Sequence, residues 1–176
     1  MYVAIAVGVA IALLILSLLV IASSRPNIMH VERKTTIKAG PENILPLILD
    51  FHRWTAWSPY EKLDPAMKKT YSGAAEGVGA VYQWVGNAKA GEGRMEIIKA
   101  DPGQVSIKLD FIKPFEGHNI AAFNLTPTGA GTDVVWSMDG PSPFMAKVMG
   151  LFINMDAMIG NDFEKGLADM KAAAEG

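Results

Sequence analysis

The chain opens with an unbroken apolar run. Residues 3–22 read VAIAVGVAIALLILSLLVIA, interrupted only by Gly8 and Ser17, and the first charged side chain is Arg25. Twenty helical residues cover about 30 Å, roughly the hydrocarbon thickness of a bilayer. A helix satisfies its own backbone hydrogen bonds, as lipid requires. The pattern predicts a transmembrane anchor over residues 1–23, crossing the membrane through residues 3–22, and a linker over residues 24–28.

A cleaved signal peptide is the alternative, because Val-Ile-Ala at 20–22 before Ser23 is a tolerable cleavage context. Nothing basic precedes the run, however, and the run is longer than a usual signal-peptide core. We therefore expect the span to be retained. Arg25, Arg33 and Lys34 follow it, so the positive-inside rule predicts a single-pass membrane protein whose soluble domain is cytoplasmic.

After the linker, the period of the pattern changes to two. Val31, Arg33, Thr35 and Ile37 alternate with polar residues, which predicts a first strand. Two short helices are expected next, one over the apolar residues 44–51 and one over residues 52–57. From residue 67 onward, short alternating segments separated by turns predict strands over 68–72, 80–86, 93–100, 104–111, 118–126 and 132–138.

Beyond residue 143 the pattern is helical again. Apolar residues recur at steps of three and four from Val148 to Met170, although Gly150, Gly160 and Gly166 each cost about 1 kcal/mol relative to Ala in a helix. The simplest prediction is one long helix, straight or bent. The whole order predicts an α+β fold, in which an antiparallel sheet of about seven strands curves around the C-terminal helix.

Several stretches carry a resemblance to a known family. Residues 37–59, IKAGPENILPLILDFHRWTAWSP, are similar to its recurrent start: a strand, Ala-x-Pro, an apolar helix ending in Asp, then Trp before Ser-Pro. The matching positions are Ala39, Pro41, Ile44, Leu47, Asp50, Trp54, Trp57 and Pro59. Four later segments are also similar to sequences of this family: GVGAVYQWVG, GEGRMEI, GTDVVWSMDG and FEKGLADMK. Over residues 29–173 the chain resembles the SRPBCC (START-like, Bet v 1-like) superfamily, in its polyketide cyclase/dehydrase and lipid-transport branch. The N-terminal span departs from the typical soluble member.

That resemblance implies a helix-grip fold with a hydrophobic pocket between the sheet and the C-terminal helix, and an apolar small molecule or lipid as the ligand. The residues expected to line the pocket are Trp54, Tyr82, Trp84, Phe111, Phe123, Trp136, Met138, Phe152, Met155 and Ile159. Periodicity alone does not distinguish a pocket wall from ordinary core. Of the two neighbouring tryptophans, we assign Trp57 to the core and Trp54 to the rim of the pocket.

Four residues are candidates for acid–base chemistry. They are Glu96, Asp110, His118 and Asp156. A carboxylate desolvated in an apolar cavity has a raised pKa and can transfer protons. The alternative is that Glu96 and Asp110 form ion pairs with Arg94 on the solvated convex face of the sheet, and that Asp156 lies at the edge of the helix stripe.

Charge and composition exclude other classes. The 16 basic and 18 acidic side chains are interspersed without a basic stripe, so nucleic acid is not a predicted partner. No cysteine is present and the three histidines lack ligand spacing, so no metal site is predicted. Gly77-x-Gly79 and Gly91-x-Gly93 fall in turns, and no G-x-S-x-G occurs, so no cofactor and no activated serine are predicted.

Three hypotheses remain open. The first is a membrane-tethered, non-enzymatic binding domain for an apolar molecule or lipid taken from the adjacent bilayer. The second is a cyclase or dehydrase acting on a polyketide-like substrate, which would need a buried acid or base beside a cavity. The third is a protein-interaction module, with no partner indicated, which would show a filled core and an exposed aromatic patch.

Overall fold

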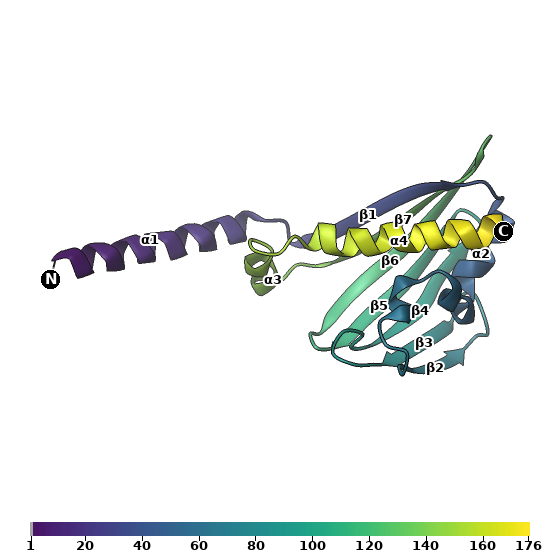
Figure 1. Cartoon of the computed structure of the whole chain (residues 1–176), viewed down its shortest axis with the longest axis horizontal. Helices are drawn as coiled ribbons and strands as arrows, with labels where there is room; N and C mark the ends of the chain where they lie inside the picture. Colours follow the sequence, from purple (N-terminus) through teal and green to yellow (C-terminus); the bar gives the residue numbers. More distant parts are fainter. Residues whose placement is uncertain (1) are drawn as a thin grey trace.

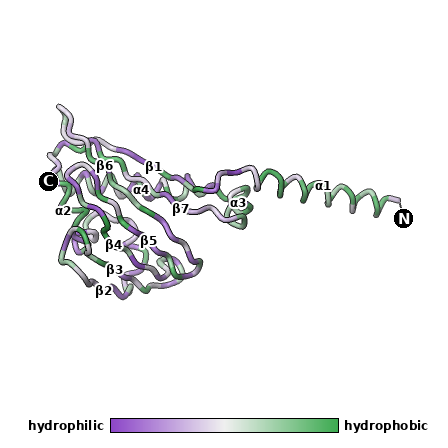
Figure 2. The backbone as a smooth tube through the Cα atoms, turned by 180° about the vertical axis from the view of Figure 1, so that it is seen from behind, coloured by the Kyte–Doolittle hydropathy of each residue, from purple (hydrophilic) through white to green (hydrophobic). Residues whose placement is uncertain are grey.

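The computed structural model describes residues 2–176, without the side chain of Ala4. Helix α1 (Tyr2–Ser24) projects from the rest of the chain as a separate rod (Figure 1). Most of its length is hydrophobic (Figure 2). The predicted anchor therefore forms a helix over its described residues, and Met1 lies outside them.

A single antiparallel sheet and one long helix make up the remainder. The elements in chain order are β1 (Ile28–Ile37), α2 (Pro41–Leu49), the 3₁₀ helices η1 (Phe51–Ala56) and η2 (Pro59–Lys62), β2 (Lys68–Gly73), β3 (Ala80–Val85), β4 (Glu92–Asp101), β5 (Gln104–Lys113), β6 (Gly117–Thr128), β7 (Gly131–Pro141), α3 (Phe144–Met149) and α4 (Met155–Glu175). The seven strands lie in the order β1-β7-β6-β5-β4-β3-β2. Helix α4 crosses the concave face of the sheet (Figure 1). The predicted α+β helix-grip fold is confirmed.

Period-two alternation places the apolar side chains under α4. In β6, for example, Ala121, Phe123 and Leu125 are buried while Ile120 is exposed. The expected first strand behaves in the same way, with Val31 and Ile37 fully covered. Because neighbouring strands are in register, these residues form one continuous inner face.

Aromatic rings fill the centre of the interior. Phe163 of α4 stacks on Trp136 of β7, with ring centroids 4.0 Å apart and planes 8° apart. Phe123 stacks on the same indole at 5.1 Å, and Trp57 meets it edge-on at 5.4 Å. This contact between ring faces fixes how closely α4 approaches the sheet.

Trp54 lies in the core, and the assignment of this residue to a pocket rim was wrong. Its exposed fraction is 4%, and its indole N–H donates to the Ile48 carbonyl at 3.0 Å. The reason is the 3₁₀ geometry of η1, in which residues three apart share one face. Phe51, Trp54 and Trp57 therefore all point inward, and the indole N–H of Trp57 donates to the Leu47 carbonyl at 2.8 Å. The aromatic density of this segment closes one end of the core.

The continuous C-terminal helix was also a wrong prediction. The run is broken between α3 and α4, where Gly150 caps the first helix and Asn154 begins the second. The Asn154 side chain accepts a hydrogen bond from the backbone N–H of Ala157 at 3.0 Å, as a helix N-cap does. As a result, Phe152 is 73% exposed and lies outside the interior.

Helix α4 approaches the sheet closely at Gly166, which generates a stability prediction. A Cβ there would lie 2.7 Å from Cζ3 of Trp136 and 3.0 Å from Cδ of Pro59. Overpacking costs about 1–3 kcal/mol, which outweighs the gain of up to about 1 kcal/mol in helix propensity. We expect Gly166→Ala to lower Tm in thermal unfolding followed by circular dichroism. Gly129→Ala, with nothing within 4 Å of its Cβ, is the matched control and should leave Tm nearly unchanged. An unchanged or higher Tm for Gly166→Ala would contradict this packing account.

Candidate ligand site

The interior has one closed end and one open end. Around α2 and η1, the inner-face side chains of Ile37, Val105 and Phe123 are fully buried. At the opposite end, where β1 begins and β5 finishes, Met29 and Phe111 are only partly buried. Helix α4 starts at this second end, close to α1 and α3 (Figure 1). The open end is therefore the place where a ligand could reach the apolar face.

Asn119 is the polar group at this open end. It lies in phase with Ala121 on the inner face of β6 and is only 9% exposed. Its side-chain amide makes no hydrogen bond to the described residues. Gly140 provides the space for it, because a Cβ there would lie 1.8 Å from Oδ1 of Asn119. Among the described residues, the fully buried side-chain polar atoms without a partner are Ser58 Oγ and the Trp136 indole nitrogen, and the Asn119 amide is not one of them. The amide therefore keeps some contact with solvent at this end, where it can pair with a polar atom of a bound molecule.

An aromatic wall stands beside that amide. Gly117 lies between the two, since a Cβ there would be 3.6 Å from Nδ2 of Asn119 and 3.7 Å from Cδ2 of Phe111. Phe111 meets Trp84 edge-on, with ring centroids 6.1 Å apart. The Trp84 indole lies across Gly93 and donates its N–H to the Ala90 carbonyl at 2.9 Å. The open end thus combines two aromatic faces with one unpaired amide.

The ten residues expected to line a pocket divide into groups. Tyr82, Trp84, Phe111, Phe123, Trp136 and Met138 lie on the inner face of the sheet. Ile159 packs against the core from α4, while Met155 is partly exposed at the start of that helix. Trp54 is in the core and Phe152 is on the surface, as described above.

A buried polar cluster, which sequence reasoning missed, lies near the β2 edge. The Glu61 side chain is 5% exposed, accepts a hydrogen bond from the Tyr82 hydroxyl at 2.7 Å and pairs with the Lys69 ammonium group. Burial and this carboxylate hold the pKa of Tyr82 well above its usual range. The three groups satisfy one another and join η2 to β2 and β3. No periodic signal marks Glu61, because it lies in a 3₁₀ helix of only four residues.

Three of the four acid–base candidates are on the outer face of the sheet. Glu96 pairs with Arg94 at 2.7 Å. Asp110 pairs with His118 at 2.8 Å and with Lys108 at 3.1 Å. The His118 contact lowers the pKa of Asp110, and the Asp110 contact raises the pKa of His118. The structure therefore brings these groups together in ion pairs, away from the interior.

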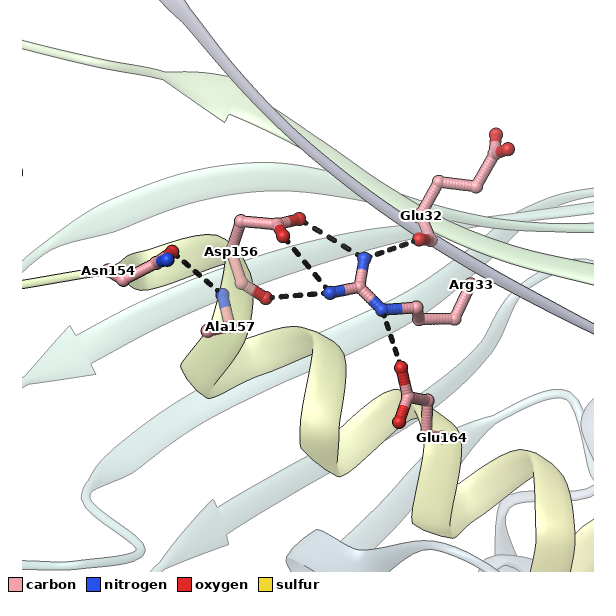
Figure 3. A network of polar contacts seen from close by, with 6 residues as sticks. All are labelled: Glu32, Arg33, Asn154, Asp156, Ala157 and Glu164. Atoms are coloured by element: carbon pink, nitrogen blue, oxygen red, sulfur yellow. Dashed lines mark hydrogen bonds and ion pairs between the residues drawn. The ribbon is translucent and has the colours of Figure 1, made fainter.

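Asp156, the fourth candidate, belongs to an arginine network (Figure 3). The guanidinium of Arg33 donates to both carboxylate oxygens of Asp156, at 3.1 and 3.0 Å, and to its backbone carbonyl at 3.2 Å. It also donates to Glu164 at 3.0 Å and to the Glu32 carbonyl at 2.7 Å. All five N–H groups are used. The hydrogen bonds from Arg33 lower the pKa of Asp156.

Gly160 makes that network compatible with a close helix. A Cβ at this position would lie 2.0 Å from the Arg33 guanidinium, so a side chain here would displace it. With glycine, the first turns of α4 lie directly against β1. Arg33 therefore holds α4 to the sheet beside the open end.

Two hollows lie at the β2–β3–β4 side of the sheet. A cavity of about 140 Å³ beside η1 is lined by Phe51, His52, Tyr71 and neighbouring small residues, and His52 stacks on Tyr71 at 3.9 Å. A wider, open hollow of about 380 Å³ lies between the β3–β4 hairpin and Lys113-Pro114. Within residues 2–176, no group of three His, Asp or Glu side chains is placed to hold a metal ion.

Comparison with known proteins agrees with this architecture. Residues 29–175 match the family model described as polyketide cyclase / dehydrase and lipid transport, so the chain belongs to that family. No curated protein matches the chain.

Solved structures show the same fold at low identity. Protein CV1439 from Chromobacterium violaceum is 16% identical, with a TM-score of 0.59 over 86% of this chain and 99% of that one. The di-domain ARO/CYC StfQ from the steffimycin biosynthetic pathway is 10% identical, with a TM-score of 0.63 over 84% of this chain and 51% of that one. Major latex-like protein 151 from Panax ginseng is 16% identical, with a TM-score of 0.57 over 84% of this chain and 97% of that one.

The outer-face pair of Asp110 and His118 makes stability depend on pH. The raised pKa of His118 gives a contribution that is complete below its ordinary value of 6.5 and is lost as pH rises through the folded-state pKa. The lowered pKa of Asp110 gives a contribution that is present above its ordinary value of 3.8 and is lost as pH falls through the folded-state pKa. The pair therefore stabilises the fold most between these two ordinary values.

We expect the Tm difference between the wild type and His118→Gln to be largest near pH 5 and to shrink by about pH 9. Thermal unfolding of both proteins across that range measures it. In an Asp110→Asn background, His118→Gln should show a smaller dependence, which the remaining pair of His118 with Glu116 at 3.3 Å would account for. A Tm difference that stays constant with pH would contradict the pairing.

Proposed function

We propose that this protein is a membrane-anchored binding domain for a hydrophobic small molecule or lipid, held between the sheet and α4. Residues 1–23 would form the anchor, residues 24–28 the linker and residues 29–176 the binding domain. One observation carries the proposal. The apolar inner face is accessible at the end next to α1, and an unpaired amide, Asn119, lies at that opening.

The composition and exposure of α1 support the anchor. Over Ile5–Ser24 the mean hydropathy reaches 3.1, and only 6% of that stretch is buried. A water-soluble protein rarely leaves so much contiguous apolar surface uncovered, whereas a bilayer covers it. The positive charges of Arg25, Arg33 and Lys34 after the span favour a cytoplasmic domain.

The placement of the ionisable groups favours binding over catalysis. Glu96, Asp110 and His118 are paired on the outer face, and Asp156 is neutralised by Arg33. The Tyr82 hydroxyl inside the sheet is committed to Glu61. A cyclase or dehydrase would need an acid or base free to reach the substrate. Membership of the family and the likeness to StfQ are consistent with an apolar ligand of lipid or polyketide type.

A pair of adjacent residues tests the position of the ligand. Phe111 faces the open end of the interior, whereas Ile112, next in the same strand, is 48% exposed on the opposite face. An arginine at position 111 would place a charge at the opening, which is costly beside an apolar ligand. We expect the full chain to retain one hydrophobic molecule in native mass spectrometry, to lose it in Phe111→Arg and to keep it in Ile112→Arg.

The control variant places the same charge one residue away, so a general effect of arginine would appear in both. Lipid extraction from the same preparations identifies the class of the retained molecule. A wild-type protein that is empty, and that also takes up no cis-parinaric acid, would refute the binding function and favour an interaction module.

Asn119 is expected to recognise a polar atom of the ligand. Asn119→Leu should weaken binding of oleyl alcohol by about fivefold relative to 1-octadecene, because a hydrogen bond contributes roughly 1 kcal/mol. Competition of each compound with bound cis-parinaric acid measures this ratio. Asn124→Leu, which faces outward on the same strand, is the matched control. Equal effects on both compounds would show that Asn119 shapes the site without pairing with the ligand.

A further inference from the structure

A short apolar surface surrounds the point where α1 meets the domain. We call residues 144–153 the junction segment; it contains α3 and the turn that follows. Its exposed apolar side chains are Phe144, Met145, Met149, Phe152 and Ile153. Exposure reaches 68% for Met145 and 73% for Phe152. Such a cluster is unusual on a surface that faces only water.

Specific contacts hold the junction segment against the end of α1. Ala22, in the last turn of α1, is fully buried and Leu18, one turn earlier, is half-buried, whereas most of the helix is exposed; α3 is the element that packs there. The Arg25 guanidinium donates to the Gly150 carbonyl at 2.8 Å. The Lys147 ammonium group donates to the Asn27 side chain at 2.5 Å. These bonds set the height of the junction segment relative to the end of the helix.

That height is the level of a membrane surface. If Ile5–Ser24 cross the bilayer, the last turn of α1 lies where the hydrocarbon gives way to headgroups. From residue 141 to residue 155 the chain carries no acidic residue and one basic residue, Lys147. Lys147 is buried, with 8% of its surface exposed, and its ammonium group is bonded to Asn27, so the exposed side chains of the junction segment are apolar. An exposed apolar surface beside a membrane span is typical of segments that lie in the interface.

We propose that the junction segment is seated in the headgroup region of the bilayer that α1 spans, with Phe152 and Met145 inserted among the lipids. This inference rests on the anchor in the proposed function. Helix α4 starts at Met155, just after the junction segment. A junction segment in the headgroup region would therefore place the start of α4 and the open end against the membrane. A lipid could then pass between the bilayer and the inner face without crossing bulk water.

The bilayer fits this surface better than a second copy of the chain does. The junction segment packs against the helix that would already be in lipid, and its apolar side chains remain exposed. A dimer contact would instead need a complementary surface of standard size, and ten residues alone do not supply one.

Single-cysteine labelling tests whether the junction segment lies in the bilayer, since the chain has no cysteine of its own. Full-length Phe152→Cys and Met145→Cys, labelled with an NBD fluorophore, would be reconstituted in vesicles of dioleoyl phosphatidylcholine and phosphatidylglycerol at about 3:1. We expect blue-shifted emission and strong quenching by lipids with a nitroxide near the headgroup. Val78→Cys is the control: Val78 is 58% exposed in the β2–β3 turn, at the far end of the sheet, and its label should remain unquenched.

Leu13→Cys, in the middle of α1, separates failure of the seat from failure of the anchor. If deep nitroxides quench the Leu13 label while the labels at positions 145 and 152 are exposed to water, α1 spans the bilayer but the junction segment does not lie in the headgroup region. An unquenched Leu13 label would overturn both. The labels at 145 and 152 could instead be shielded from aqueous iodide without being quenched by any nitroxide lipid. That result would contradict insertion of the junction segment into the bilayer and would favour a contact between two copies of the chain.

Discussion

The stacking of Phe163 on Trp136 fixes the relation between the two main parts of this fold. The two rings lie 4.0 Å apart and nearly parallel, so they hold α4 at its middle against the centre of the sheet. Gly166 allows the next turn of the helix to come equally close. The first turns of α4 then extend beyond this contact over the open end, where the Arg33 network takes over from apolar packing. Aromatic stacking thus holds α4 against the middle of the sheet, and the hydrogen bonds of Arg33 hold it at the open end.

Much of this arrangement could be predicted from the sequence, because it depends on period. Alternation in QVSIKLDF and in the residues after His30 identified strands and their inner faces, and the order of elements gave the helix-grip architecture. The failures have local causes that period does not contain. The apolar rhythm from Val148 to Met170 continues across the break after α3, so it could not reveal a helix end set by Gly150 and Asn154. Trp54 was misplaced because the sequence did not show that residues 51–56 form a 3₁₀ helix, in which side chains three residues apart are eclipsed on one face.

The site was predicted less completely than the fold, for a related reason. The aromatic residues of the inner face follow from alternation, and so, in principle, does Asn119, which keeps step with Ala121 and Phe123. Asn119 is a candidate ligand contact because its side-chain amide makes no hydrogen bond to the described residues. Only a three-dimensional structure shows whether a side chain has a hydrogen-bond partner. The same holds for Arg33, whose two partner residues beyond its own strand neighbour, Asp156 and Glu164, come from α4. Tertiary contacts of this kind join residues more than a hundred positions apart, and no short-range pattern records them.

The connection between α1 and β1 is only Arg25–Asn27, and hydrogen bonds to α3 and to Ser142 further restrain it. A long flexible linker would let the domain tumble and search a volume of solution above its membrane. This short, pinned connection removes that freedom. The domain would stay close to one leaflet and would diffuse laterally with its lipids. Delivery of a ligand to a second membrane would therefore require that membrane to come within the length of the domain.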